Sequence, residues 1–330
     1  MCAIRTTKLA KTGLVLSELG LGCASLAGSV TAVPELDARA TIVAARQAGI
    51  AYFDTAPFYG HGLSERFVGD ALRGHAGLTL SSKVGRLLRP GNSIQAAAWP
   101  TALPFSVTFD YSYDGIKRSF DDSLQRLGLD HINILYIHDI GSAAHGAEVG
   151  PALYETAMTG GYRARSALRA SGAVDAIGLG VNEAAVCLAT LDRGDWDVFL
   201  LAGRYTLLEQ HPLEDLFPAC ERAGTDVVLG GPFNSGILAG GRTYDYGQVS
   251  TQIQARVAGL ARVCAAHAVP LAAAALRFPT GHKLIKSVIP GPRTSVELAQ
   301  ILEWWNIEIP DALWRDLKSE GMLRVDAPTP

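Results

Sequence analysis

Four side chains that can hold or transfer protons stand at, or just past, the ends of short apolar runs. Asp54, Lys83 and His138 each end such a run, and Tyr59 follows Asp54 by five residues. A lysine that is removed from water needs a carboxylate partner, and its charge can lower the pKa of a neighbouring phenol. We therefore expect an acid/base cluster in which Asp54 pairs with Lys83, Lys83 acidifies Tyr59, and His138 donates to a carbonyl or hydroxyl oxygen.

Each of these residues also has a plain structural explanation when it is taken alone. An aspartate at a strand end is often a turn former, a lone histidine after an apolar run is often a core residue, and a loop tyrosine usually packs. The chemical interpretation depends on a fold that brings all four to one face.

Eight short apolar or β-branched runs predict the strands of such a fold. Several are nearly continuous apolar runs, as is typical of parallel strands that are buried on both faces. The predicted strands are Glu18–Cys23, Ala51–Thr55, Leu78–Val84, Ile132–His138, Ala176–Val181, Val198–Ala202, Asp226–Gly230 and Leu284–Ile289.

Helical patterns lie between these runs, and many end at a glycine that can serve as a C-terminal cap. A last short helix is expected after Pro310. The other predicted helices are Asp37–Ala48, Ser64–Arg73, Asp114–Leu127, Arg163–Ala170, Glu183–Leu191, Leu213–Arg222, Thr251–Ala266 and Ser295–Trp305.

This alternation predicts an α/β fold, a (β/α)8 TIM barrel that forms a single domain over residues 1–330. A doubly wound open sheet is the alternative, but Gly20–Ser25 lacks the third glycine of a dinucleotide fingerprint. Thr7–Ala10 and Leu14–Ser17 flank a turn and predict an N-terminal hairpin that plugs the barrel floor.

Two long loops, Arg86–Asp110 and Asp139–Gly160, follow the third and fourth predicted strands. Loops at the carboxyl ends of barrel strands build active sites, so both are expected to shape a substrate site.

Composition restricts the class of protein. Of the 330 residues, 48% are hydrophobic and 18% are charged, which excludes a disordered chain. The net charge of −3 makes nucleic acid an unexpected partner, and no apolar run approaches the ~20 residues of a membrane span. The N-terminus lacks the apolar core of a signal peptide, so a cytoplasmic enzyme with a small-molecule substrate is expected.

Neither disulfides nor a metal site are indicated. The five cysteines are far apart and the eight histidines are scattered without paired-ligand spacing. We expect buried thiols in a reducing compartment. The oligomeric state cannot be inferred from the pattern.

Several blocks together resemble the aldo-keto reductase superfamily over essentially the whole chain. They are Leu19–Gly22, Phe53–Gly60 with Gly62, Ser64, Glu65 and Gly69, then Lys83, Ile134–His138 and Gly178–Asn182. The resemblance implies that Asp54, Tyr59, Lys83 and His138 are the family's catalytic tetrad. Arg204–Gln210 and Gly230–Gly236 resemble the branch of L-fucose and D-threo-aldose 1-dehydrogenases and pyridoxal 4-dehydrogenases.

The resemblance also implies an extended NAD(P)H bound across the barrel mouth. Asn182 matches the residue that holds the nicotinamide carboxamide. The other matching positions are Gly22 at the first strand, Asn234, Ser235 and Gly236 near the pyrophosphate, and Gly291, Pro292, Arg293, Glu297 and Gln300 around the adenosine 2′ position.

The residues near the adenosine ribose depart from the NADP-binding pattern. Glu297 stands where many NADP-binding relatives have a basic or amide side chain, and a carboxylate repels a 2′-phosphate but accepts from a 2′-hydroxyl. Arg293 could instead pair with a 2′-phosphate. NAD is therefore favoured, with NADP as the alternative.

The implied reaction is oxidation of an aldose hemiacetal at C1 to a lactone, with Phe58, Trp99, Tyr111 and Asp139 as candidate substrate-lining residues. Oxidation of pyridoxal to its lactone is the nearest alternative. A Schiff-base aldolase that uses Lys83 as nucleophile is an alternative of another class. A regulatory barrel that only senses nicotinamide is a third, which the intact tetrad disfavours.

Overall fold

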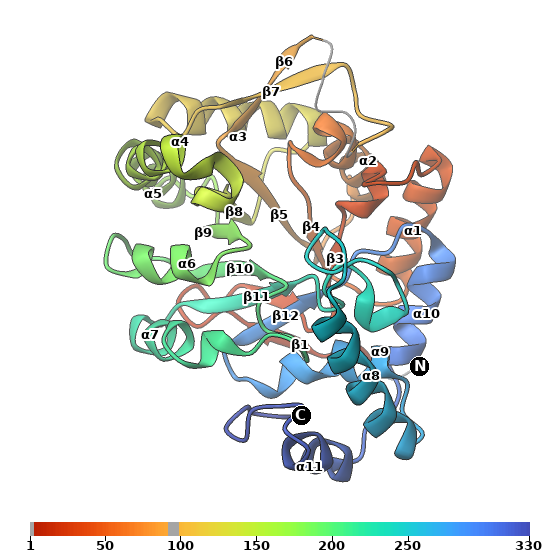
Figure 1. The fold of residues 1–330 in the computed structure, drawn as a ribbon. Coiled ribbons are helices and arrows are strands. Elements are labelled where there is room, and N and C mark those ends of the chain that lie inside the picture. Colours follow the sequence, from red (N-terminus) through yellow and green to blue (C-terminus); the bar gives the residue numbers. More distant parts are fainter. Residues whose placement is uncertain (1–2, 92–98) are drawn as a thin grey trace.

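The computed structural model describes residues 3–91 and 99–330, and its centre is a sheet of eight parallel strands (Figure 1). The sheet order along the chain is β3, β4, β5, β8, β9, β10, β11 and β12. These strands span Leu21–Gly22, Tyr52–Asp54, Thr79–Val84, Ile134–His138, Ala176–Val181, Val198–Ala202, Asp226–Gly230 and Ile285–Ile289.

The first and last strands meet and close the sheet into a barrel. Leu19 forms a parallel bridge with Val288, and the Gly20 amide donates to the Val288 carbonyl at 2.9 Å. The predicted (β/α)8 barrel is confirmed, and the doubly wound open sheet is excluded.

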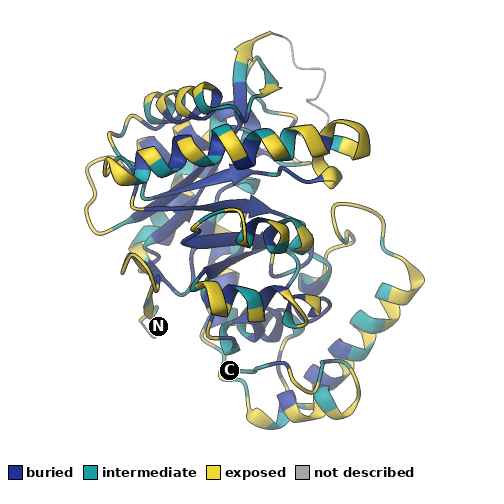
Figure 2. Cartoon of the chain, turned by 90° about the vertical axis from the view of Figure 1, so that its left-hand side faces the viewer, coloured by how far each residue is buried: buried dark blue, intermediate teal, exposed yellow. Residues whose placement is uncertain are grey.

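Side chains alternate between the barrel interior and the layer under the helices. Along β8, Ile134 and Tyr136 belong to the interior cluster, whereas Leu135 and Ile137 pack against the helices. Both faces of the strand are thus buried, which explains its apolar run from Ile134 to Ile137 (Figure 2).

The helices surround the barrel, and their exposed faces point outward (Figure 2). The helices are α1 (Glu35–Gln47), α2 (Leu63–Leu72), α3 (Tyr113–Leu127), α4 (Ser142–Thr156), α5 (Tyr162–Ala170), α6 (Ala184–Leu191), α7 (Leu216–Ala223), α8 (Thr251–Ala266), α9 (Leu271–Arg277), α10 (Ser295–Trp305) and α11 (Asp311–Ser319).

The predicted N-terminal hairpin is present and seals the floor of the barrel. Its strands, β1 (Thr6–Lys8) and β2 (Val15–Ser17), pair antiparallel. Leu9 and Leu16 are buried in the same cluster as the interior side chains of the barrel strands. The Thr79 hydroxyl donates to the Val15 carbonyl at 2.7 Å, which ties the hairpin to β5.

Most predicted elements are confirmed within a few residues, and β9, β10 and β11 have the predicted bounds. The first strand is shorter than predicted, because only Leu21–Gly22 forms a regular ladder with β4. Within the two predicted loops the structure adds the antiparallel pair β6 (Arg86–Pro90) and β7 (Phe105–Phe109), and α4. The short helix α9 was also not predicted.

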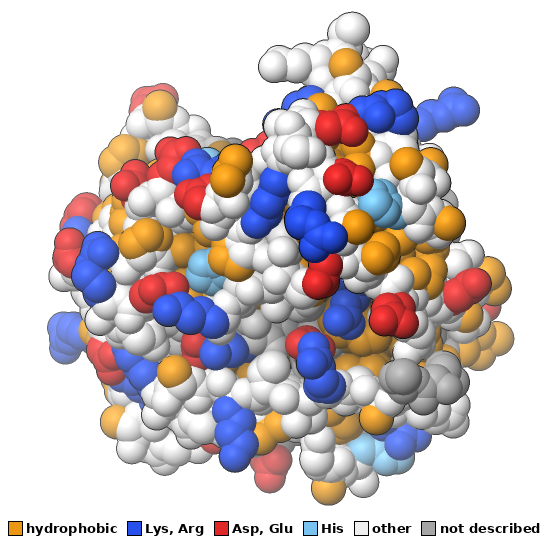
Figure 3. Space-filling model, turned by 90° about the horizontal axis from the view of Figure 1, so that it is seen from below, with side chains coloured by type: hydrophobic (Ala, Val, Ile, Leu, Met, Phe, Trp, Pro, Cys, Tyr) orange, Lys and Arg blue, Asp and Glu red, His pale blue; other side chains and the backbone are white. Residues whose placement is uncertain are grey.

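Surface charge is mixed, with acidic and basic side chains interleaved over the face seen in Figure 3. Among the described residues no single helix is long and apolar enough to cross a membrane. One pair, Thr251–Ala266 with Leu271–Gly281, meets that criterion jointly but is bent by 98°.

Candidate active site

A buried ion pair joins the carboxyl ends of β4 and β5. The Lys83 Nζ donates to Asp54 Oδ2 at 2.6 Å and to the Thr55 carbonyl at 2.9 Å. The Ser81 hydroxyl donates to the other carboxylate oxygen of Asp54 at 2.7 Å. Burial raises the pKa of the Asp54 carboxyl, whereas the Lys83 charge and both hydrogen bonds act to lower it. The predicted pairing of Asp54 with Lys83 is present.

Two glycines of the neighbouring strand β9 make room for this pair. A Cβ on Gly180 would lie 3.1 Å from Lys83 Cε, and a Cβ on Gly178 would lie 1.7 Å from the Val198 carbonyl oxygen. Gly180 therefore leaves room for the end of the Lys83 side chain, while Gly178 lets β9 approach β10 closely.

Tyr59 is held by a left-handed turn that follows β4. Gly60 and His61 have φ of 59° and 51°, and a Cβ on Gly60 would clash with Ala27. The Gly60 carbonyl accepts from the Leu103 amide at 3.0 Å, which anchors the turn. This conformation requires glycine at position 60.

The Tyr59 ring lies among the other tetrad members. Its centroid is 4.8 Å from Lys83 Nζ and 5.7 Å from the His138 ring, which is perpendicular to it at 87°. The Trp99 ring centroid lies 5.8 Å from that of Tyr59, and the two ring planes are tilted by 31°. The structure therefore brings together all four residues of the predicted acid/base cluster.

The pKa of Tyr59 differs from the expectation that Lys83 acidifies it. Burial raises the pKa of the phenol well above its usual value, and the Asp54 carboxylate raises it further. Because Asp54 neutralises the Lys83 ammonium at 2.6 Å, little net positive charge reaches the phenol. Tyr59 is therefore a neutral phenol near neutral pH, suited to donating a proton.

His138 ends β8 as a neutral imidazole. Burial lowers its pKa well below the usual value, and the nearby cations Arg86 and Lys83 lower it further. Its Nε2 lies 3.4 Å from Asp139 Oδ2, and its Nδ1 is buried without a protein partner among the described residues. A neutral imidazole can donate one hydrogen bond without carrying charge into the site.

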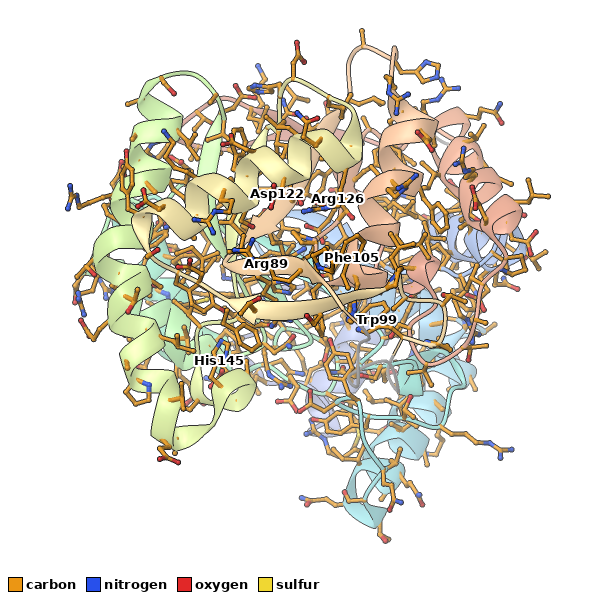
Figure 4. The ribbon with its side chains drawn as sticks, turned by 90° about the horizontal axis from the view of Figure 1, so that it is seen from above. Arg89, Trp99, Phe105, Asp122, Arg126 and His145 are labelled. Carbon is orange, nitrogen blue, oxygen red and sulfur yellow. The ribbon has the colours of Figure 1, made fainter. Side chains whose placement is uncertain are left out.

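Three of the four candidate substrate-lining residues gather beside this cluster. Phe58 lies edge-on to both His138 and Trp99, with centroid distances of 6.1 and 5.7 Å. Trp99 lies toward the tip of the β6–β7 hairpin, with His145 near its base (Figure 4). Asp139 follows His138 directly.

Tyr111 has a different place from the one expected. It is fully buried, and its hydroxyl donates to the backbone carbonyls of His138 and Asp139 at 2.8 and 2.9 Å. The tyrosine thus fixes the backbone at the end of β8, and its hydroxyl is not free to bind a substrate.

Sequence reasoning missed Arg86, which enters the site from β6. Its Nη2 donates to Asp139 Oδ2 at 2.7 Å, and its guanidinium lies 4.2 Å from the centroid of the Phe58 ring. The available signal was its place three residues after Lys83. Because a loop was expected at this position, nothing in the sequence connected Arg86 with Asp139, which lies 53 positions away.

Two candidate cofactor glycines lie against each other where the barrel closes. The Gly22 amide donates to the Pro290 carbonyl at 2.9 Å. A Cβ on Gly291 would lie 3.1 Å from the Ser25 hydroxyl and 3.4 Å from the Gly22 carbonyl. This strip without side chains suits the close approach of a dinucleotide backbone.

A second candidate cofactor segment follows β11. Asn234, Ser235 and Gly236 all have positive φ, of 46°, 61° and 103°. The Asn234 side chain is used within the loop, since it accepts from the Thr206 hydroxyl and donates to the Gly203 carbonyl at 3.0 Å. The Asn234 and Gly236 amides donate to the Gly231 and Phe233 carbonyls at 3.0 Å, so among the described residues the Ser235 amide is the one in this segment left for a pyrophosphate oxygen.

Asn182 directly follows β9, and its side-chain amide is unbonded in the part of the chain that the structure describes. Its carbonyl accepts from Arg204 Nε at 2.6 Å, and the same guanidinium pairs with Asp245 at 2.8 Å. Arg204 therefore fixes the Asn182 backbone and leaves its amide free for a ligand such as a carboxamide.

The candidate ribose residues form a closed charge pair. Arg293 Nη2 donates to Glu297 Oε1 at 2.6 Å, and the Arg293 backbone amide donates to Glu297 Oε2 at 2.7 Å. Partial burial raises the pKa of Glu297, but these hydrogen bonds outweigh it and hold the pKa below its usual value. Pro292 is buried, and the exposed Gln300 side chain donates to Glu303.

Other chemistries find little support in the described residues. No group of three or more His, Cys, Asp or Glu side chains is placed there to hold a metal ion. The Lys83 amine is engaged by Asp54 and Thr55 as an ammonium, which does not suit a Schiff-base nucleophile.

Comparisons with known proteins agree with this geometry. A sequence model of the aldo/keto reductase family matches residues 18–320. The chain is 41% identical to the pyridoxal 4-dehydrogenase of Microbacterium luteolum, over 96% of this chain and 97% of that one. It is 36% identical to the D-threo-aldose 1-dehydrogenase of a Pseudomonas species, over 97% and 98%.

Solved structures show the same fold. The holo form of an aldo-keto reductase from Bacillus halodurans superposes with a TM-score of 0.75, at 23% identity and 96% coverage of both chains. The glycerol dehydrogenase of Gluconobacter oxydans gives a TM-score of 0.75 at 19% identity, covering 100% of this chain and 98% of that one.

The lowered pKa of His138 predicts that its imidazole stays neutral well below pH 6.5, where an unfolded histidine gains a proton. In ¹³C-histidine-labelled protein, the NMR signal that disappears in His138→Asn should keep the shift of a neutral ring from pH 8 to pH 5.5. A midpoint near 6.5 for this signal would contradict the assigned environment.

Proposed function

The chain belongs to the aldo/keto reductase family, and on that premise we propose that it oxidises the C1 hemiacetal of an aldose to a lactone with NAD(P). The observation that carries the proposal is the Tyr59 phenol, set between the buried Lys83–Asp54 pair and a neutral His138. Relatives named D-threo-aldose 1-dehydrogenase and L-galactose dehydrogenase, the latter from Arabidopsis thaliana at 27% identity over 88% of this chain and 85% of that one, support an aldose as substrate.

The tetrad supports proton transfer at one oxygen of the substrate. In reduction the Tyr59 phenol gives its proton to the carbonyl oxygen. In oxidation Tyr59 must first lose this proton to solvent, and its phenolate then takes the proton of the C1 hydroxyl. Because the pKa of Tyr59 is raised, the resting phenol is poised for reduction, and oxidation is favoured by alkaline pH. His138 donates to the same oxygen and orients it.

The residues present fit a nicotinamide dinucleotide. Asn182 would hold the carboxamide, the left-handed segment Asn234–Gly236 the pyrophosphate, and the strip at Gly22 and Gly291 the backbone of the dinucleotide. When bound, the nicotinamide supplies the acceptor for the hydride from C1.

We favour NAD over NADP because the Arg293 guanidinium is already hydrogen-bonded to the Glu297 carboxylate. A 2′-phosphate would have to displace that carboxylate from Arg293 and would lie beside its negative charge. A ribose 2′-hydroxyl can donate to Glu297 without breaking the pair.

Pyridoxal is the second candidate substrate. The relative named pyridoxal 4-dehydrogenase has the higher identity, 41%. Pyridoxal also forms a cyclic hemiacetal that is oxidised to a lactone, so the same proton transfer at Tyr59 would serve it.

A screen of aldoses and pyridoxal with NAD and NADP, read at the nicotinamide absorbance, tests the proposal together with Tyr59→Phe. The wild type should oxidise at least one aldose, and the variant should lose at least about 100-fold in kcat because the proton acceptor is gone. Cofactor binding, followed by tryptophan fluorescence, should stay within about two-fold, since the phenylalanine keeps the ring. Turnover of the variant near the wild-type rate would remove Tyr59 from the assigned role.

Glu297→Gln tests the choice of cofactor. The amide cannot neutralise Arg293, so the ratio of kcat/KM with NADP to that with NAD should rise about ten-fold, the equivalent of roughly 1.4 kcal/mol. Glu308→Gln, at an exposed position just beyond α10, is the matched control and should leave the ratio unchanged. A wild-type preference for NADP would contradict the hypothesis that Glu297 disfavours the 2′-phosphate.

A further inference from the structure

A second ion pair lies beside the tetrad, between Arg86 and Asp139. Arg86 is only 6% exposed, its Nη2 donates to Asp139 Oδ2 at 2.7 Å, and its guanidinium lies 4.2 Å from the centroid of the Phe58 ring. The Phe109 ring is 5.6 Å away. Two aromatic rings and a carboxylate thus hold a planar cation in one orientation.

The backbone of Asp139 is fixed as firmly as its side chain. The residue has a φ of 41°, its amide donates to the Gly180 carbonyl at 3.0 Å, and its carbonyl accepts from the Tyr111 hydroxyl at 2.9 Å. His145 Nε2 donates to the same carbonyl at 2.7 Å. A left-handed conformation at an aspartate is kept only where its surroundings hold it, and such positions cluster at functional sites.

The pair lies next to the reacting position. Asp139 Oδ2 is 3.4 Å from His138 Nε2, and the Phe58 ring contacts both Arg86 and His138. The charges of Arg86 and Asp139 both act on the Tyr59 phenol. A substrate whose reacting oxygen lies between Tyr59 and His138 would place its neighbouring atoms against Arg86 and Asp139.

The hydrogen-bonding capacity left on the pair is complementary. Arg86 Nε is buried without a protein partner, and Asp139 Oδ1 accepts no hydrogen bond from the described residues. An unused buried donor is costly unless a ligand satisfies it. One free donor and one free acceptor match a hydroxyl group, which both accepts and donates.

The charge of the region points to a neutral ligand. Lys83 pairs with Asp54, Arg86 pairs with Asp139, and His138 is neutral. An anion would find no uncompensated cation among these side chains, whereas the hydroxyl of a sugar needs none.

We propose that Arg86 and Asp139 bind the hydroxyl on the carbon next to the reacting hemiacetal carbon, and so select aldoses that carry a C2 hydroxyl. This inference rests on the proposed oxidation of an aldose and names the part of the substrate that the site recognises. Arg86 Nε donates to the hydroxyl oxygen, and Asp139 accepts its proton. The contact turns C1 toward Tyr59 and His138.

The test combines a substrate that lacks the C2 hydroxyl with a variant that lacks the Asp139 carboxylate. L-fucose and 2-deoxy-L-fucose are compared as substrates of the wild type and of Asp139→Asn. A site built around a hydroxyl rejects the analogue that lacks it, so the wild type should prefer L-fucose by at least about 100-fold in kcat/KM. In the variant this preference should fall below about five-fold, because only the turnover of L-fucose depends on the contact.

A matched control separates the contact from the loss of any buried ion pair. Asp197 is 2% exposed and pairs with Arg169 at 2.8 Å, at the opposite end of the strands. Asp197→Asn should keep the wild-type preference. Arg86→Gln is the second variant and should also lose the preference, while binding of NAD measured by fluorescence shows that each variant is folded.

Three outcomes would overturn the inference. If Asp139→Asn lowers kcat/KM equally for both sugars, the pair only supports the fold. If the wild type oxidises pyridoxal and no aldose, the assignment of a sugar hydroxyl is wrong although the hemiacetal chemistry stands. If neither class is oxidised, the proposed function itself fails, and that result is distinct from the first because the wild type shows no turnover.

Discussion

The buried ion pair of Lys83 with Asp54 is the interaction on which the rest of the site depends. The two residues are 1% and 3% exposed, and moving two charges out of water costs several kcal/mol for each ion, which their attraction offsets only with good geometry and further hydrogen bonds. The structure meets this demand with Ser81, with the Thr55 carbonyl and with the space left by Gly180. Replacing such a pair by apolar residues often leaves stability unchanged, so stability alone does not explain its presence. Its effect on Tyr59 is electrostatic. Because Asp54 neutralises the charge of Lys83, the nearby ammonium does not lower the pKa of the phenol, and Tyr59 stays protonated.

The barrel turns four separate stretches of sequence into one site, because the carboxyl ends of all parallel strands meet at one rim. Three basic side chains at this rim each form an ion pair with a neighbouring carboxylate. Lys83 is matched by Asp54, Arg86 by Asp139, and Arg293 by Glu297. The first pair supports proton transfer. The second is proposed to bind a hydroxyl of the substrate, and the third is proposed to disfavour the 2′-phosphate of NADP. Neutral pairs of this kind suit a substrate without charge.

The sequence predicts best the bounds of those strands whose residues are almost all buried. Apart from Asp226, which begins β11, the strands β9, β10 and β11 are apolar, and they have the predicted bounds. The tetrad follows from side chains at strand ends. Helix α4 escaped prediction because Gly146, with a φ of 76°, kinks it and Pro151 lies inside it, so no continuous helical pattern runs through Ser142–Thr156. Arg86 escaped because its role depends on Asp139, which no local pattern connects to it. The expected acidification of Tyr59 failed since the charge of Lys83 was considered without its partner, whose 2.6 Å distance only the structure gives.

The central claim is that the ion pair of Lys83 with Asp54 serves catalysis and not stability. A double-mutant cycle of Asp54→Leu and Lys83→Met, with urea unfolding and turnover measured on each protein, tests it most directly. Each single variant should lose about 3 kcal/mol in the free energy of unfolding, because it leaves one buried polar group without its partner. The double variant should recover most of that loss and yet turn over at least about 100-fold more slowly than the wild type. A double variant that stays as unstable as the two losses added together, or that keeps wild-type turnover, would contradict the claim.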